Sequence, residues 1–177
     1  MSTHATRIPD AAEIREAARR FKVGPGGVGE PEDFGDAEVG QAQRAFALLN
    51  NPAFYKKTTK YPDFTSYGLK HQLERTYKAL INSQTYYICN GAAIVAAKLC
   101  GVKHKTNSDS SNAALAIKPV FTLSKYEKLF QESRGKSSDI HTHRFNLFDA
   151  NTQDESARFL ANINADSLDT LIKTSLA

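Results

Sequence analysis

The 177-residue sequence holds two cysteines, one methionine and no tryptophan. Two cysteines are too few for a disulfide-stabilised scaffold or for a zinc site built from four thiolates. No apolar run approaches the roughly 18 residues that a membrane-spanning helix requires, so we expect no contact with a membrane. Residues 1–20 lack the apolar core of a secretory signal, which predicts a cytoplasmic protein.

Signatures of several enzyme and binding families are absent as well. No G-x-S-x-G motif is present, and neither Cys89 nor Cys100 stands beside a histidine that would activate its thiol. The glycine-rich run at 24–29 follows no strand-like segment and precedes no Lys-Ser or Lys-Thr pair, which argues against a phosphate-binding P-loop. Zinc-finger and RNA-recognition signatures do not occur. The sequence therefore predicts no metal site and no cofactor, and it favours a non-enzymatic protein.

The residues that are present predict a helical fold. With 41 % hydrophobic and 24 % charged residues, the chain can bury a core. Capping residues followed by helical periodicity predict helices that begin near residues 10, 36, 66, 90, 124, 152 and 167. The small side chains of 91–97 predict that the fourth of these is central. Short strands are predicted at 102–106, 113–121 and 140–147. We expect a compact, mainly α-helical domain of the α+β class with a minor two- or three-stranded sheet.

Residues 23–36 divide the chain into parts. They contain five glycines and two prolines, a composition that favours a linker or loop over a helix or strand. Before them, Asp10 and Glu13 match a capping box that opens an amphipathic helix. We therefore expect a flexible N-terminal helical arm at 1–22, a linker at 23–36 and one globular domain at 37–177. The arm is expected to be either detachable or docked back on the domain.

The charge is distributed unevenly along the chain. Residues 1–50 contain 6 Lys or Arg and 8 Asp or Glu, residues 51–144 contain 15 and 6, and residues 145–177 contain 2 and 5. All seven tyrosines lie in the basic middle region. Lysines interleaved with tyrosines are typical of surfaces that contact phosphates and stack on bases. The alternative interpretation is that the lysines solvate helix faces while the tyrosines cover the edge of the core.

The basic middle region supplies the candidate binding residues. The expected phosphate contacts are Lys56, Lys57, Lys60, Lys70, Arg75, Lys103 and Lys105. Tyr55 and Tyr61 are the expected stacking residues. The prediction requires that these side chains gather into one continuous surface when the helices pack. It also requires that the acidic C-terminal helices do not neutralise them.

Histidines are the main candidates for catalysis. His141 and His143 share one side of a predicted strand, but a His-x-His pattern fixes no third metal ligand. His71 lies in a predicted helix beside Lys70 and four residues before Arg75. The alternative interpretation is that the first two are half-buried strand residues and that His71 is an ordinary surface residue. No catalytic residue is therefore assigned.

One segment resembles proteins of bacterial phages and mobile elements. The run Ser66-Tyr67-Gly68-Leu69-Lys70-His71 is followed by Tyr87, Asn90-Gly91-Ala92 and Ala96-Ala97. This pattern is similar to one found in short uncharacterised proteins of those elements, and it covers residues 66–105. The resemblance implies an accessory protein that acts on nucleic acid or on a host factor, and it implies no catalytic residue.

Three functions follow from these features. The favoured one is a non-enzymatic protein that binds a polyanion, with nucleic acid as the expected partner, through its basic, tyrosine-rich middle region. The first alternative is an effector or inhibitor that binds an acidic surface of a host protein, which requires an apolar patch at the centre of the contact. The second is a small hydrolase or transferase with a histidine-centred site.

Overall fold

The computed structural model describes residues 7–30, 32–83, 85–106, 110–134, 145–150 and 152–176, apart from the side chains at 130, 133, 134 and 153. Within these residues lie seven α-helices: α1 (Ala11–Phe21), α2 (Asp36–Leu49), α3 (Ser66–Leu80), α4 (Asn90–Leu99), α5 (Glu127–Arg134), α6 (Gln153–Asn162) and α7 (Ala165–Leu176). A 3-10 helix, Leu123–Tyr126, leads into α5. No helix in this part of the chain has both the length and the apolar character that crossing a lipid bilayer requires.

The strands of the described residues are short and pair two by two. They are β1 (Val23–Gly24), β2 (Gly27–Val28), β3 (Tyr55–Lys57), β4 (Ile81–Asn82), β5 (His104–Thr106), β6 (Ala113–Leu115), β7 (Ile117–Pro119) and β8 (Phe148–Asp149). The pairs β1–β2, β3–β7 and β5–β6 are antiparallel, and β4–β8 is parallel. The predicted mainly α, α+β class is confirmed, with its strands spread over four small sheets.

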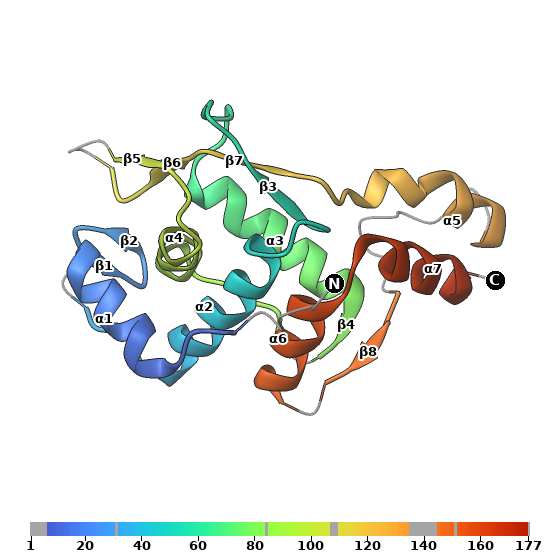
Figure 1. Cartoon of the computed structure of the whole chain (residues 1–177), viewed down its shortest axis with the longest axis horizontal. Coiled ribbons are helices and arrows are strands. Elements are labelled where there is room, and N and C mark those ends of the chain that lie inside the picture. Colours follow the sequence, from blue (N-terminus) through green and yellow to red (C-terminus); the bar gives the residue numbers. More distant parts are fainter. Residues whose placement is uncertain are drawn as a thin grey trace, which may run out of the picture.

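Helix α4 is the centre of the core, as its small residues predict. In Figure 1 it is seen almost end-on, surrounded by α1, α2, α3 and the β1–β2 hairpin. Every residue from Ala92 to Ala97 is fully buried. Gly91 shows how close the neighbours come, because a Cβ atom there would lie 1.9 Å from the carbonyl oxygen of Gly24. The absence of bulk on α4 therefore lets the hairpin backbone pack directly on the helix.

The N-terminal helix α1 is docked on the domain, the second of the two arrangements expected for it, and is part of the core, so that the description of it as a flexible arm is wrong. Its capping box is present as predicted: the Asp10 side chain accepts from the Glu13 amide, and the Glu13 side chain accepts from the Asp10 amide. Ile14 and the alanines one turn later are buried against α2 and α4. The predicted linker at 23–36 begins with the β1–β2 hairpin, which is bonded to the body through Val28 N and Ser111 O at 2.8 Å.

The C-terminal helices complete the core on the side of α2. Helix α6 packs along α2, and the Asn51 side chain donates to the carbonyls of Leu160 and Ile163 at 2.7 and 2.8 Å. The buried Tyr77 hydroxyl of α3 donates to Ser156 Oγ of α6 at 2.7 Å. These bonds between residues distant in sequence fix α6 against both α2 and α3.

Candidate functional site

Five exposed lysines lie on or next to the strands of two small sheets that are joined to each other. We call this set the lysine corner: Lys56, Lys57, Lys103, Lys105 and Lys118. On β3 and β7, Lys56 stands directly opposite Lys118, and on β5 and β6, Lys105 stands opposite Ala114. Ala116 joins the two sheets, because its amide donates to the carbonyl of Lys103 and its carbonyl accepts from Thr58, both at 2.8 Å. The two sheets are therefore joined at Ala116, and the five lysines are exposed residues of their strands or, for Lys103, directly precede one.

The lysine corner carries positive charge without an internal counter-charge. None of its five ammonium groups has a carboxylate within 4.0 Å in the described part of the chain. Like charges directly opposite each other on paired strands destabilise a sheet, and Lys56 and Lys118 are such a pair. A bound anion would relieve this repulsion.

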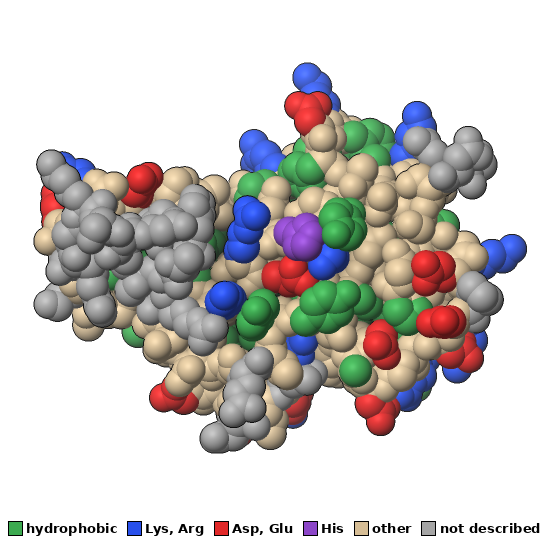
Figure 2. All heavy atoms as spheres, turned by 180° about the vertical axis from the view of Figure 1, so that it is seen from behind, with side chains coloured by type: hydrophobic (Ala, Val, Ile, Leu, Met, Phe, Trp, Pro, Cys, Tyr) green, Lys and Arg blue, Asp and Glu red, His purple; other side chains and the backbone are tan. Residues whose placement is uncertain are grey.

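A second basic surface lies along α3. We call it the α3 face, formed by Tyr67, Lys70, His71, Glu74, Arg75 and Lys78 of the helix and by Tyr86 and Tyr87 of the following segment. The helical residues recur at intervals of three and four, which places them on one side of α3. Figure 2 shows a histidine and a carboxylate on the surface, with Lys or Arg and hydrophobic side chains around them. Because tyrosine counts as hydrophobic in that colouring, this view agrees with a cationic, aromatic surface.

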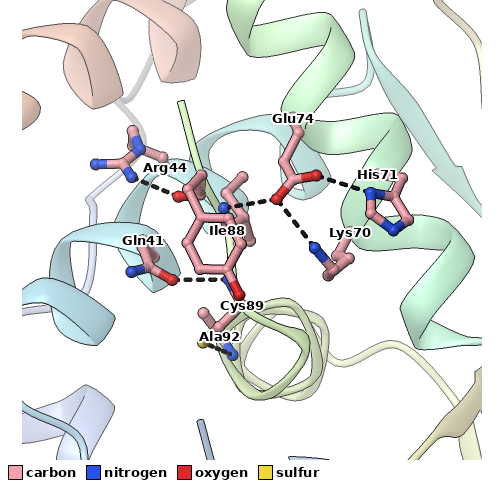
Figure 3. A network of polar contacts seen from close by, with 9 residues as sticks. Gln41, Arg44, Lys70, His71, Glu74, Ile88, Cys89 and Ala92 are labelled. Carbon is pink, nitrogen blue, oxygen red and sulfur yellow. Dashed lines mark hydrogen bonds and ion pairs between the residues drawn. The ribbon is translucent and has the colours of Figure 1, made fainter. Parts of the chain in front are cut away.

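Glu74 is the hub of the α3 face, as the network in Figure 3 shows. Its carboxylate accepts from Lys70 Nζ at 3.1 Å and from the Ile88 amide at 3.0 Å, and it lies 2.9 Å from His71 Nδ1. The Lys70 and Glu74 side chains are only 6 % and 12 % exposed. A buried charge is stable only when it is paired and hydrogen-bonded. Each charge of the pair is therefore stabilised by the other. Glu74 also joins α3 to the segment that follows Ser83.

Side chains of α2 hold the other edge of that segment (Figure 3). Arg44 Nη2 donates to the carbonyl of Tyr87 at 2.9 Å, and Gln41 Oε1 accepts from the Cys89 amide at 2.7 Å. Cys89 Sγ in turn accepts from the Ala92 amide and caps α4. The backbone from Tyr87 to Cys89 is therefore fixed by side chains from two different helices.

Arg44 is an unusual member of this network. It is among the largest fully buried side chains in the described residues. Its Nε and Nη1 atoms have no hydrogen-bond partner there, and its guanidinium carbon lies 5.2 Å from the centre of the Tyr77 ring. Burial lowers the pKa of Arg44. The ring face and the Tyr87 carbonyl are the two groups that stabilise its charge.

Cations and tyrosine rings alternate on the α3 face. Lys70 Nζ lies 5.3 Å from the ring centre of Tyr67 and 4.8 Å from that of Tyr87, so one ammonium contacts both rings. Lys78 Nζ lies 4.9 Å from the ring centre of Tyr86. Tyr67, Lys70 and Tyr87 line a pocket of about 400 Å³ together with Asn90 and the turn of the β1–β2 hairpin. We call it the tyrosine pocket.

The predicted phosphate contacts divide between the two surfaces. Lys56, Lys57, Lys103 and Lys105 are brought together in the lysine corner, and Lys60 is exposed in the loop that follows β3. Arg75 is exposed on the α3 face. Lys70 is different, because it is buried and paired with Glu74. It is therefore a structural cation of the α3 face and not a free phosphate contact.

The two predicted stacking residues also differ. Tyr61 is exposed, as stacking requires, whereas Tyr55 is buried. At the start of strand β3 the Tyr55 side chain is buried in the core, and the next residue, Lys56, projects to the other face and is exposed. Burial raises the pKa of the Tyr55 hydroxyl. Tyr55 as a stacking residue is therefore wrong.

Of the three candidate catalytic histidines, the structure describes only His71. His141 and His143 lie outside the described residues. His71 is oriented by Glu74 and by an edge-on contact of its ring with Tyr67, whose centre lies 4.8 Å away. In the described part of the chain no group of three or more His, Cys, Asp and Glu residues is placed to hold a metal ion.

The cysteines are not nucleophiles of the usual kind. Cys89 and Cys100 are both buried, and burial raises the pKa of each thiol, that of Cys100 to about 12. A reactive cysteine needs the opposite shift, because the thiolate is the nucleophile. Their position agrees with two small core residues next to α4.

Sequence reasoning missed several residues of these surfaces. Tyr67, Tyr86 and Tyr87 were visible as part of the tyrosine-rich region, and Tyr67 precedes Lys70 and His71 by three and four residues, a spacing that indicates one helix face. Lys118 joins the lysine corner through the β3–β7 register, which no local pattern reveals. Arg44 lies on α2, outside the basic region altogether.

Comparisons with known proteins leave the function to be argued from these surfaces. No family model matches the sequence, and neither a curated protein nor a solved structure shows significant similarity to it. The likeness of residues 66–105 to phage and mobile-element proteins stays a prediction.

Proposed function

We propose that this protein is a non-enzymatic nucleic-acid-binding protein that contacts phosphates through the lysine corner and the α3 face. It would act as an accessory factor of the kind that the resemblance to phage and mobile-element proteins implies. Its partner would be held mainly by charge, because clustered lysines release counter-ions from a phosphate backbone.

The opposed lysines of β3 and β7 carry this proposal. Lys56 and Lys118 are exposed, directly opposite and without a carboxylate partner among the described residues. A protein that gained only stability from these positions would place opposite charges there. The pair is therefore better explained by an external anion than by the needs of the fold.

The aromatic side chains favour nucleic acid over an acidic protein. A protein contact requires an apolar centre within the basic surface. Of the seven large hydrophobic side chains exposed in the described residues, four are tyrosines, and three of these lie on the α3 face beside cations. Tyrosine rings beside cations are typical of surfaces on which bases stack.

The test is the salt dependence of binding, measured by fluorescence anisotropy with a labelled mixed-sequence oligonucleotide. We expect the affinity to fall steeply between about 50 and 200 mM salt. The double variant Lys56→Gln/Lys118→Gln should reduce the slope of log K against log salt by about 2. The matched control is Lys128→Gln/Lys173→Gln, which removes the same charge from lysines of α5 and α7 that are paired with Glu132 and Asp169.

Two outcomes would contradict the proposal. One is an affinity that hardly changes over this range of salt. The other is an equal loss in the corner variant and the control, since that would reflect net charge alone and not a site at the lysine corner.

A further inference from the structure

We infer that the preferred ligand is a single-stranded nucleic acid, one base of which stacks in the tyrosine pocket. This inference rests on the proposed function and specifies the class of nucleic acid. The juxtaposition that carries it is a buried lysine between two exposed tyrosine rings at the mouth of a pocket of about 400 Å³.

The two rings have free surface for a ligand. Tyr67 and Tyr87 are 52 % and 57 % exposed, more than any other large hydrophobic side chain in the described residues. An exposed aromatic face offers stacking to every base, because every base has a π-face. In a duplex the bases are already stacked on one another, so only an unpaired base can use these rings.

The pocket is held in place before any ligand arrives. Lys70 contacts both rings and is itself fixed by Glu74. Glu74 also binds the Ile88 amide, and Arg44 binds the Tyr87 carbonyl, so that the backbone under one ring is anchored to α2 and α3. A preorganised site loses less conformational entropy on binding. This network, seen in Figure 3, gives the buried Arg44 and Glu74 a positioning role.

The polar groups of the pocket are largely committed to the protein. The Asn90 side-chain nitrogen donates toward the carbonyls of Gly26 and Ser111 and toward Asn112 Oδ1, whereas Asn90 Oδ1 has no partner among the described residues but is buried, out of a ligand's reach. Lys70 Nζ is paired with Glu74. Reading a base by its edge requires free donors and acceptors. We therefore expect stacking with little preference for one base.

The pocket lies within the α3 face, and its wall continues toward the lysine corner. Asn112 at its wall is followed directly by β6, whose Ala114 stands opposite Lys105 of the lysine corner. In the other direction α3 runs from Tyr67 to Lys78, a distance of about 16 Å at 1.5 Å per residue. A strand with one base in the pocket can therefore contact cations on both sides of it.

The experiment compares a labelled single-stranded oligonucleotide of about 12 nucleotides, within the usual site size of such proteins, with the duplex of the same sequence. We expect the single strand to bind at least about tenfold more tightly, an effect within the range that stacking supplies. The double variant Tyr67→Ala/Tyr87→Ala should lose this preference, because its affinity for the single strand falls more than its affinity for the duplex. Tyr67→Phe/Tyr87→Phe is the matched control and should keep the preference, because it retains both rings.

A measurement on the unmodified protein supports the same test. The sequence has no tryptophan and seven tyrosines, so its fluorescence comes from tyrosine alone. Stacking in the pocket should quench part of it with the single strand and not with the duplex. This readout stays valid even if the alanine variant folds poorly.

The inference and the proposed function fail in different ways. Equal affinity for both forms, with no effect of the alanine variant and no quenching, overturns the single-strand inference and leaves salt-dependent binding by the lysine corner intact. If the affinity changes neither with the salt concentration nor in the Lys56→Gln/Lys118→Gln variant, the proposed function itself is wrong.

Discussion

Two ion pairs with the same sequence spacing lie on two different helices of this protein. Lys70 and Glu74 are four residues apart on α3, and Lys128 and Glu132 are four residues apart on α5. The side chains of the first pair are 6 % and 12 % exposed and their charged atoms lie 3.1 Å apart. Those of the second are 89 % and 60 % exposed and lie 3.8 Å apart. Sequence spacing is identical, and the surroundings differ completely.

The difference shows that a basic residue acquires its role from its environment. On α3 the pair is part of a network that fixes the segment from Tyr87 to Cys89. On α5 the pair is a solvated contact of the kind that contributes little to stability. The lysine corner is a third case, in which exposed lysines have no acidic partner among the described residues. Only the third arrangement leaves its charge free for an external anion.

The largest expected effect is the removal of the α3 carboxylate. Glu74→Ala leaves the Lys70 ammonium buried without a counter-charge and the Ile88 amide without its acceptor. Breaking a buried ion pair in this way costs about 3 kcal/mol or more. Urea unfolding followed by circular dichroism measures the loss of stability.

The matched control is Glu132→Ala, which should change the free energy of unfolding by about 0.5 kcal/mol or less because its pair is exposed. A second control, Lys70→Met/Glu74→Met, removes both charges together and should cost much less than Glu74→Ala. Similar losses for Glu74→Ala and Glu132→Ala would show that the contrast between the two pairs is wrong.

Two glycines in helices test the same difference between a tightly packed and an open environment. The expected effect on stability is smaller. A Cβ atom on Gly91 would collide with the Gly24 carbonyl at 1.9 Å, whereas one on Gly68 would meet only the Phe64 side chain, at 3.2 Å. Gly91→Ala should destabilise the protein by about 2 kcal/mol, since overpacking moves the hairpin backbone. Gly68→Ala should change the stability by about 1 kcal/mol or less, because the gain in helix propensity is opposed by the small shift that the new Cβ requires of Phe64.

Thermal unfolding of the two variants in parallel decides this prediction. If Gly91→Ala has the same melting temperature as the wild type, the hairpin is not packed tightly against α4, and residues 23–36 behave as the linker that their composition indicates.

Local sequence rules predicted the helices and some of their starts. The capping boxes at Asp10 and Thr152 are present because they involve residues only three apart. The helix expected to begin near residue 124 begins later as an α-helix, since residues 123–126 form a 3-10 helix and α5 begins at Glu127. Ser66 lies at the start of α3, but its hydroxyl accepts from the Ala113 amide in a tertiary contact.

The candidate site was predictable only in part, because its geometry depends on contacts distant in sequence. The basic region and its tyrosines were visible, but the burial of Tyr55 and Lys70 was not. The pairing of Lys56 with Lys118 depends on a strand register, and a shift of one residue would turn both side chains to the other face. Arg44 reaches Tyr87 across 43 positions of the chain.

A third prediction separates the two ion pairs by salt. Double-mutant cycles on Lys128–Glu132 should give a coupling energy of about 0.5 kcal/mol or less at low ionic strength. At 1 M salt the screening length is about 3 Å, so this coupling should vanish. The coupling of Lys70 with Glu74 should change little, because solvent ions do not enter between buried groups. Equal salt sensitivity of the two couplings would contradict the assigned difference in burial.

The smallest expected effect concerns Asp169, where α7 meets the 3-10 helix before α5. Lys173, the Tyr126 hydroxyl and Lys125 bond its carboxylate at 2.7, 2.9 and 3.2 Å, and they lower its pKa to about 2. The unfolded chain has the ordinary value of about 3.9. Because the pKa is lower in the folded state, the stabilisation is complete above about pH 4 and is lost as the pH falls toward 2.

Asp169→Asn should therefore lower the urea midpoint slightly at pH 6, and the difference from the wild type should shrink at pH 3. The effect is small because the ion pairs at this site are partly solvated and screened. A difference that stays constant or grows on acidification would mean that the carboxylate charge is not what joins α7 to the 3-10 helix. In that case Asp169 would not neutralise Lys125 and Lys173 to any useful extent. These lysines would then resemble those of the lysine corner, and the electrostatic difference between the paired and the unpaired lysines would disappear.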